Sequence, residues 1–181
     1  MTDRPDLLSQ AVAFFARFRV TIGFLLAAFV LWLAEPTRSS ITWGLPVVVA
    51  GESIRVWAAG HLNKSREVTR SGPYRFVAHP LYLGSSILGA GLVIAARSVP
   101  VAAIITAYLG VTLTSAIKSE EAFLRRVFRD TYEEYRDTGV VDRERRFSVS
   151  RAIANREYRA VAGVVVVLLL LVWKATYNGM F

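Results

Sequence analysis

Long apolar blocks, separated by charged blocks rich in arginine, dominate this sequence of 181 residues and constrain its fold more than any other feature. A helix needs about 20 mostly apolar residues to cross the hydrocarbon core of a membrane, within a usual range of about 17–25. Five blocks approach that length: residues 18–34, 41–62, 81–96, 99–117 and 160–173. They predict an all-α, polytopic membrane protein with five transmembrane helices, folded as one membrane domain over residues 1–181.

The positive charges alternate between the two ends of these expected spans. Eleven Lys and Arg residues lie in segment 118–159, four in 63–78 and three before residue 20, whereas the segments on the opposite side carry one each. Because Lys and Arg gather on the cytoplasmic side of membrane proteins, we expect the N-terminus and the arginine-rich segments to be cytoplasmic. Apolar side chains at helical spacing in residues 118–136 predict an amphipathic helix on that surface.

The composition also narrows the possible partners and cofactors. The chain has no cysteine and only two histidines, which excludes disulfides and thiolate metal sites, so no metal is expected. A net charge of +8 is compatible with nucleic acid, anionic lipid or an anionic substrate. Because the arginines flank the apolar blocks, membrane lipids are the expected partner and nucleic acid is not.

Glu52 and Arg55 lie three residues apart inside the second expected span and therefore share one helix face. Ionised side chains at membrane depth are costly, and they usually pair with each other or line a polar cavity. Two interpretations stay open. The pair either only holds helices together, or Arg55 faces a cytoplasmic cavity and orients the anionic head group of a substrate.

His79 and Pro80 precede the third expected span, and Glu120 and Glu121 follow the fourth. Pro80 suits the first turn of a helix, which places His79 at the N-cap, where free N–H groups favour a carboxylate. Glu121 can pair with Arg125 four residues on, leaving Glu120 to turn back toward the third span. By spacing alone, a structural histidine cap and an exposed acidic start to a surface helix remain alternatives.

Two motifs in this region resemble the superfamily of isoprenylcysteine carboxyl methyltransferases and phospholipid methyltransferases. Residues 72–84 read GPYRFVAHPLYLG, and residues 120–135 read EEAFLRRVFRDTYEEY, with an expected helical hairpin between them. The superfamily pattern is GPYRxxRHPxYxG, a hairpin, then EExxLxxxFGxxYxxY, so Ala78 and Arg129 are departures from it. The resemblance covers residues 50–136, the expected methyltransferase core.

The resemblance implies transfer of a methyl group from S-adenosylmethionine to a lipid-like or isoprenoid-bearing acceptor through a carboxylate or an amine. It also implies that the cofactor is bound without a Rossmann fold. The residues that match the superfamily's cofactor site are Val68, Thr69, Tyr74, His79, Pro80, Leu81, Tyr82, Gly84 and Glu120.

Three further residues are candidates for contact with the acceptor or for catalysis. Glu121 is expected to support Glu120, and Arg55 is expected to orient the acceptor. Arg55 and Glu121 are therefore the candidate catalytic residues. Where the prenylcysteine enzymes resemble one another in an arginine one turn before the glutamates, this chain has Ala116, with Lys118 nearby as a second candidate for contact with the substrate.

Two other functions stay open at this point. A membrane reductase of the steroid reductase type resembles this superfamily in its helical architecture and uses NADPH, which the arginine-rich side would suit. A small transporter without enzymatic activity would explain Glu52 and Arg55, but it would require neither the His-Pro nor the Glu-Glu motif.

Overall fold

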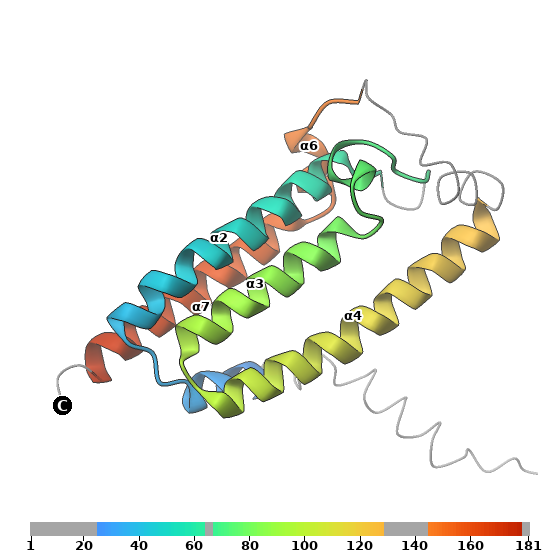
Figure 1. Ribbon diagram of the computed structural model, residues 1–181. Helices are drawn as coiled ribbons and strands as arrows, with labels where there is room; N and C mark the ends of the chain where they lie inside the picture. The colour runs from blue at the N-terminus through green and yellow to red at the C-terminus, as the bar shows by residue number, and fades with distance from the viewer. Residues whose placement is uncertain (1–24, 64–66, 129–144, 179–181) are drawn as a thin grey trace, which may run out of the picture.

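A computed structural model describes residues 25–63, 67–128 and 145–178 of the chain, and this part consists of helices and the loops between them, with no strand (Figure 1). A helical segment at residues 25–33 comes first. It is followed by α2 (Arg38–His61), the 3-10 helix η1 (Gly72–Arg75), α3 (Pro80–Ala96), α4 (Val99–Val127), α6 (Val149–Ala154) and α7 (Glu157–Asn178). The predicted all-α class is confirmed for these residues.

Two helices in the described part of the chain, α4 and α7, are both long and apolar enough to cross a membrane. The described residues thus show fewer such helices than the five predicted spans. Helix α3 is apolar but has only 17 residues, about 26 Å at 1.5 Å per residue. Helix α2 has 24 residues, but Glu52 and Arg55 lie inside it. Most of the first expected span, up to residue 24, lies outside the described residues.

Helix α4 joins two elements that the sequence predicts as separate. It runs for 29 residues from Val99 to Val127 without a break, so the fourth expected span and the start of the expected surface helix form one continuous helix. Since α3 has 17 residues, α4 extends beyond the start of its antiparallel neighbour, and its second half carries Glu120 and Glu121. The rest of the expected surface helix, from residue 129 to 136, lies outside the described residues.

Helices α2 and α3 approach each other very closely along a line of glycines. A Cβ atom added to Gly51 would lie 2.4 Å from the Leu88 nitrogen and 2.7 Å from the Gly84 carbonyl oxygen. One added to Gly44 would lie 2.6 Å from the Gly91 carbonyl oxygen. Small residues at such a contact are typical of helices that pack in lipid. The glycines fix α3 against α2, and α7 packs on the same helix (Figure 1).

We expect Gly51→Ala to lower the free energy of unfolding by about 1–3 kcal/mol. The added methyl group would collide with backbone atoms of α3, which cannot move aside as a flexible side chain can. Thermal unfolding in detergent measures the change. Gly110→Ala is the matched control, since no atom lies within 4 Å of a Cβ added there. An unchanged melting temperature for Gly51→Ala would contradict the α2–α3 contact described here.

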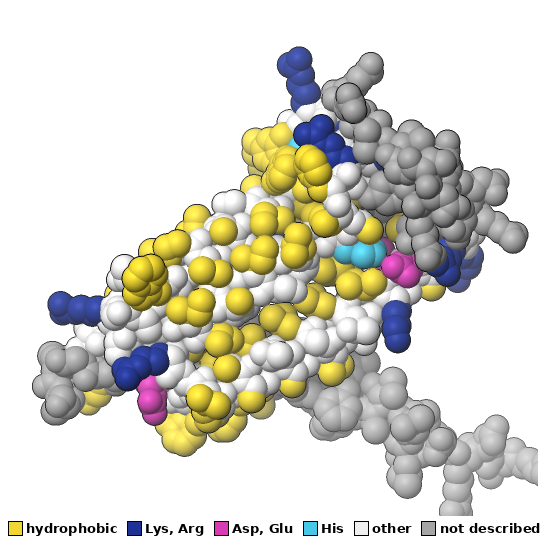
Figure 2. Space-filling view, viewed as in Figure 1, with side chains coloured by type: hydrophobic (Ala, Val, Ile, Leu, Met, Phe, Trp, Pro, Cys, Tyr) yellow, Lys and Arg dark blue, Asp and Glu magenta, His cyan; other side chains and the backbone are white. Residues whose placement is uncertain are grey.

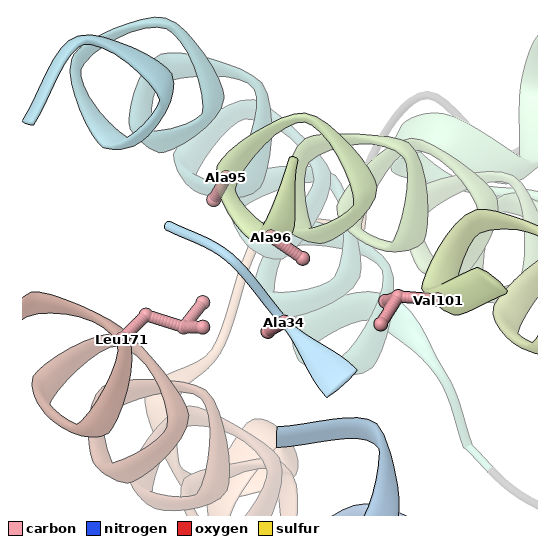
Figure 3. Packing of buried hydrophobic residues seen from close by; sticks show 5 residues of the cluster. All are labelled: Ala34, Ala95, Ala96, Val101 and Leu171. Atoms are coloured by element: carbon pink, nitrogen blue, oxygen red, sulfur yellow. The ribbon is translucent and has the colours of Figure 1, made fainter. Parts of the chain in front are cut away.

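A small apolar core closes the end of the bundle at which α3 turns into α4. Its buried side chains come from four different segments and meet in Figure 3: Ala34, Ala95, Ala96, Val101 and Leu171. The Lys174 ammonium group on α7 donates to the carbonyl oxygens of Leu31 (2.9 Å) and Trp32 (2.7 Å). These contacts satisfy carbonyls at the end of the helical segment 25–33, which has no further turn to bond them.

The surface of the described helices has the distribution that a membrane requires. On the face seen in Figure 2, hydrophobic side chains lie along the length of the bundle, and most Lys, Arg, Asp and Glu side chains lie toward its two ends. Large side chains such as Trp32, Trp43 and Trp173 are 72%, 73% and 68% exposed, respectively. Apolar surface of this extent in a soluble monomer would be unusual, and it fits a lipid environment.

Candidate methyltransferase site

A cavity of about 420 Å³ lies where the start of α3 faces the second half of α4. Volumes of about 300–1,000 Å³ are typical of sites for small molecules and cofactors. Its wall combines apolar side chains with a few polar ones: Leu62, Glu67, Val68, Thr69, Tyr74, Ala78, His79, Tyr82, Ala116, Ser119, Glu120, Phe123 and Leu124. The cavity can therefore hold a ligand that has an apolar or aromatic part and polar, charged ends.

The turn before α3 forms one wall of this cavity. Gly72 has φ = +57°, a conformation that glycine adopts without the steric cost of a side chain. An added Cβ on Gly72 would also lie 2.5 Å from the ring of the buried His61. The glycine allows η1 to pack directly over the end of α2, and this packing buries Tyr74 beside the cavity.

Helix α3 begins as the sequence predicts. His79 is the N-cap and Pro80 occupies the first turn, where its missing N–H removes no helical hydrogen bond. The amide N–H groups of Tyr82 and Leu83 donate to the His79 carbonyl oxygen at 3.1 Å each. The rings of His79 and Tyr82 pack against each other with centroids 5.6 Å apart. Both side chains are thereby held at the cavity wall.

His79 contacts both adjacent glutamates of α4. Its Nδ1 lies 3.4 Å from Glu120 Oε2, and its Nε2 lies 3.4 Å from Glu121 Oε1. The expectation of separate partners for the two glutamates is wrong in this respect, because one imidazole offers a nitrogen to each. Of the two carboxylates, Glu120 lines the cavity. The structure brings the His-Pro and Glu-Glu motifs together across the hairpin, as the sequence predicts.

The two glutamates change the protonation of His79. Its pKa is raised above the ordinary value of 6.5, chiefly because the ring hydrogen-bonds to Glu120. Partial burial opposes this increase, and the contact with Glu121 adds to it. The contacts of His79 with both carboxylates link the start of α3 to α4 and favour the protonated form of the ring, and Glu120 gives the cavity an acidic side.

A second opening continues from the cavity along the hairpin. This apolar groove between α3 and α4 has a volume of about 680 Å³ and shares His79 and Tyr82 with the cavity. Beyond them its wall is almost entirely apolar or small, and runs past Gly89 and Val93 of α3 and Leu109 and Gly110 of α4. The cavity, with its few polar side chains, and the apolar groove thus meet at the start of α3.

The part of the sequence that forms the cavity and the groove matches a known protein family. A family model described as phospholipid methyltransferase matches residues 18–131, which is more than half of the chain. The chain belongs to the phospholipid methyltransferase family. The matched residues include every side chain of the cavity and the groove.

Two curated proteins are similar to this family member over a stretch of 106 residues. The chain is 31% identical to the protein-S-isoprenylcysteine O-methyltransferase of Schizosaccharomyces pombe, over 59% of this chain and 43% of that protein. It is 27% identical to the nickel-cobalt-cadmium resistance protein NccN of Alcaligenes xylosoxydans xylosoxydans, over 58% of this chain and 48% of that protein. The match thus spans less than half the length of either relative. No solved structure is significantly similar. The resemblance seen in the motifs is confirmed.

The cavity of this phospholipid methyltransferase family member includes six of the predicted cofactor residues: Val68, Thr69, Tyr74, His79, Tyr82 and Glu120. Pro80 and Leu81 continue into α3 beside them but are not on the cavity wall. Gly84 lies in the α2–α3 contact, where an added Cβ would meet Arg55 Cγ at 2.7 Å. Lys118 is exposed on α4 and lies on the wall of neither the cavity nor the groove.

Arg55 lies apart from the cavity, in a charged cluster between helices. Its guanidinium contacts Glu52 at 3.3 Å on its own helix, Glu157 at 2.7 Å on α7, and the Ser85 hydroxyl on α3. Glu157 is buried and begins α7, where the helix dipole favours an acidic side chain. This arrangement matches the first of the two interpretations, a group that holds three helices together.

Several residues of the cavity wall were not among the predicted site residues. On α4 they are Ala116, Ser119, Phe123 and Leu124, which together with Glu120 follow the spacing i, i+3, i+4, i+7 and i+8 of one helix face. That periodicity is visible in the sequence and could have identified them. Leu62 and Glu67 on the other wall carried no such signal, because they lie in irregular chain after α2.

Proposed function

We propose that this protein is an integral membrane methyltransferase that uses S-adenosylmethionine to methylate a lipid-like or isoprenoid-bearing acceptor. The observation that carries the proposal is the junction, at His79 and Tyr82, of a cavity that has acidic side chains in its wall and an apolar groove. Membership of the phospholipid methyltransferase family supports it. The methyltransferase core of residues 50–136 and a cytoplasmic orientation of the cavity belong to the same proposal.

The residues of the cavity fit this cofactor. S-Adenosylmethionine supplies a methyl group on a sulfonium cation, together with an ammonium group, a carboxylate and an adenosine. Glu120 offers a carboxylate to the ammonium group or to a ribose hydroxyl, and Thr69 and Ser119 offer hydroxyls. Apolar side chains such as Val68 and Phe123 suit the adenine ring.

The chain's own residues then act by binding, orientation and exclusion of water. Tyr82 and His79 stand between the cavity and the groove, so they hold the reacting ends of the two ligands near each other. The apolar groove keeps water from the acceptor's tail and leaves its head at the junction. A carboxylate acceptor would need no general base, whereas an amine acceptor must first lose a proton.

Calorimetry on the purified, detergent-solubilised protein tests the cofactor, with S-adenosylmethionine and NADPH titrated separately. We expect binding of S-adenosylmethionine only, and incubation with isotopically labelled cofactor should then yield methylated lipids detectable by mass spectrometry. Binding of NADPH instead, or of neither compound, would refute the proposal.

We expect cofactor binding to release a proton from His79. The pKa of His79 is raised in the protein, mainly by Glu120, so the ring is protonated at and somewhat above pH 6.5. A cation that binds beside Glu120 lowers the pKa of His79 in the complex. At a pH between the pKa of the free protein and that of the complex, binding therefore releases a proton. Affinity should therefore rise with pH through this window and level off above it.

Calorimetry at pH 7 in two buffers with different ionisation enthalpies measures this proton directly. The observed heat should depend on the buffer for the wild-type protein and lose that dependence in His79→Gln. Identical heats for the wild-type protein in both buffers would contradict the linkage.

A further inference from the structure

The end of α2 is held by the segment that begins at Arg145. The last carbonyl groups of a helix have no partner within it, and polar side chains often supply one. Here the Asn155 amide donates to the carbonyl oxygens of both Ala59 and Leu62, at 2.9 Å each. The guanidinium of Arg151 donates to the Gly60 carbonyl oxygen at 2.8 Å. Three carbonyls near the end of α2 are thus bonded from a distant part of the chain.

The same segment packs on α2 through an aromatic side chain. A Cβ added to Gly60 would lie 2.1 Å from the Phe147 ring, so only a glycine leaves room for it. The rings of Phe147 and the buried His61 pack with centroids 6.1 Å apart. Since His61 lies under the Gly72 turn, this packing connects the segment to the turn before α3.

The segment also reaches the cavity wall itself. The Arg145 guanidinium binds both carboxylate oxygens of Glu67, one of them at 3.0 Å. Glu67 lines the cavity, and the next two residues along the wall are Val68 and Thr69. The Thr69 hydroxyl accepts a hydrogen bond from the backbone N–H of Asn63 at 3.4 Å, which connects this wall to the end of α2.

We propose that Arg145 is a positioning residue for the cofactor cavity, which it serves by holding Glu67 and with it the wall formed by residues 67–69. A bidentate contact between a guanidinium and a carboxylate fixes the relative orientation of the two groups as well as the distance between them. It also balances the charge of Glu67. This inference rests on the proposed cofactor for its functional part.

The functional test is a double-mutant cycle with Arg145→Ala, Glu67→Gln and the double variant, each assayed for S-adenosylmethionine affinity by calorimetry. We expect each single change to weaken binding by about tenfold, and the double change to weaken it no further, because the two residues act as one unit. Arg159→Ala removes an exposed arginine from the start of α7 and is the matched control, with unchanged affinity. Additive losses, or no loss for Arg145→Ala, would overturn the proposal.

Hydrogen exchange of the full-length protein without cofactor provides a test that does not depend on the proposed function. The amides of residues 67–69 should exchange faster in Arg145→Ala than in the wild-type protein or in Arg159→Ala. Arg145→Lys keeps the charge but cannot bind both oxygens, so it should give an intermediate rate, and it replaces Arg145→Ala if that variant does not fold. Unchanged exchange in both variants would overturn the positioning role. If the wild-type protein binds no S-adenosylmethionine, the proposed function fails. The exchange rates still test, in that case, whether Arg145 positions residues 67–69.

Discussion

Glu120→Gln is expected to weaken S-adenosylmethionine binding by about 10- to 150-fold, the loss that corresponds to one hydrogen bond with a charged partner. The carboxylate of Glu120 lines the cavity and lies 3.4 Å from His79. Glutamine keeps the size of the side chain and removes its charge, so the packing of α4 beside α3 is retained. The expected result is a higher dissociation constant in calorimetry and a higher KM for the cofactor, with little change in melting temperature.

Substitution of two other glutamates provides the comparison for the loss of binding in Glu120→Gln. Glu121→Gln also removes a contact with His79, but Glu121 is not on the cavity wall, so its effect should be smaller. Glu35→Gln changes an exposed residue at the other end of the bundle, where the Glu35 backbone N–H donates to the Ala96 carbonyl oxygen, and should leave binding unchanged. Equal losses for all three variants would show that net charge, and not the position of Glu120, governs binding.

The meeting of His79 with Glu120 was predictable because it depends on local features. Pro80 fixes where α3 begins, and the tight connection at Arg97 makes α3 and α4 antiparallel neighbours. The predicted third span, 81–96, agrees with Pro80–Ala96 within one residue. Given these boundaries, the lengths of the two helices bring Glu120 level with His79.

The environment of Arg55 was not predictable from its neighbours in sequence. Its partner Glu157 lies about a hundred positions later in the chain, and nothing near either residue indicates that α7 packs on α2. The same limit applies to Gly84, which the motif places in the cofactor site. Its immediate surroundings are Gly51 and Arg55 of the facing helix, a contact that depends on how the helices pack.

The described residues show fewer helices that pass the test for a span than the five predicted, for a different physical reason. Apolar composition indicates that a segment tolerates lipid, but a span also needs length, and α3 ends at Arg97 with φ = 50° after 17 residues, at the lower limit of the usual range. Helix α2 has the length and carries a charged cluster that is neutralised in part by contacts with α7. A composition-based count therefore treats helices that line a polar site in the same way as helices that face lipid.

Gly110→Leu is expected to raise the KM for a lipid acceptor by about 50-fold. This value assumes that the added side chain displaces three methylene groups of the acceptor's tail from the groove, at about 0.8 kcal/mol each. Gly110 lies on the wall of the groove between α3 and α4, and no atom lies within 4 Å of a Cβ added there. A leucine can therefore extend into the groove without disturbing the helix packing. Since Gly110 is not on the wall of the cavity, the affinity for S-adenosylmethionine should stay the same.

Gly163→Leu is the matched control for the groove. Gly163 is also a helical glycine with open space around an added Cβ, but it lies on α7 and on the wall of neither the groove nor the cavity. Both substitutions add the same apolar surface, so any general effect on insertion or detergent binding appears in both. A rise in acceptor KM for Gly110→Leu alone assigns the acceptor's tail to the groove. An equal KM in the two variants, with cofactor affinity intact, means that the acceptor reaches His79 and Tyr82 by a route that does not pass Gly110.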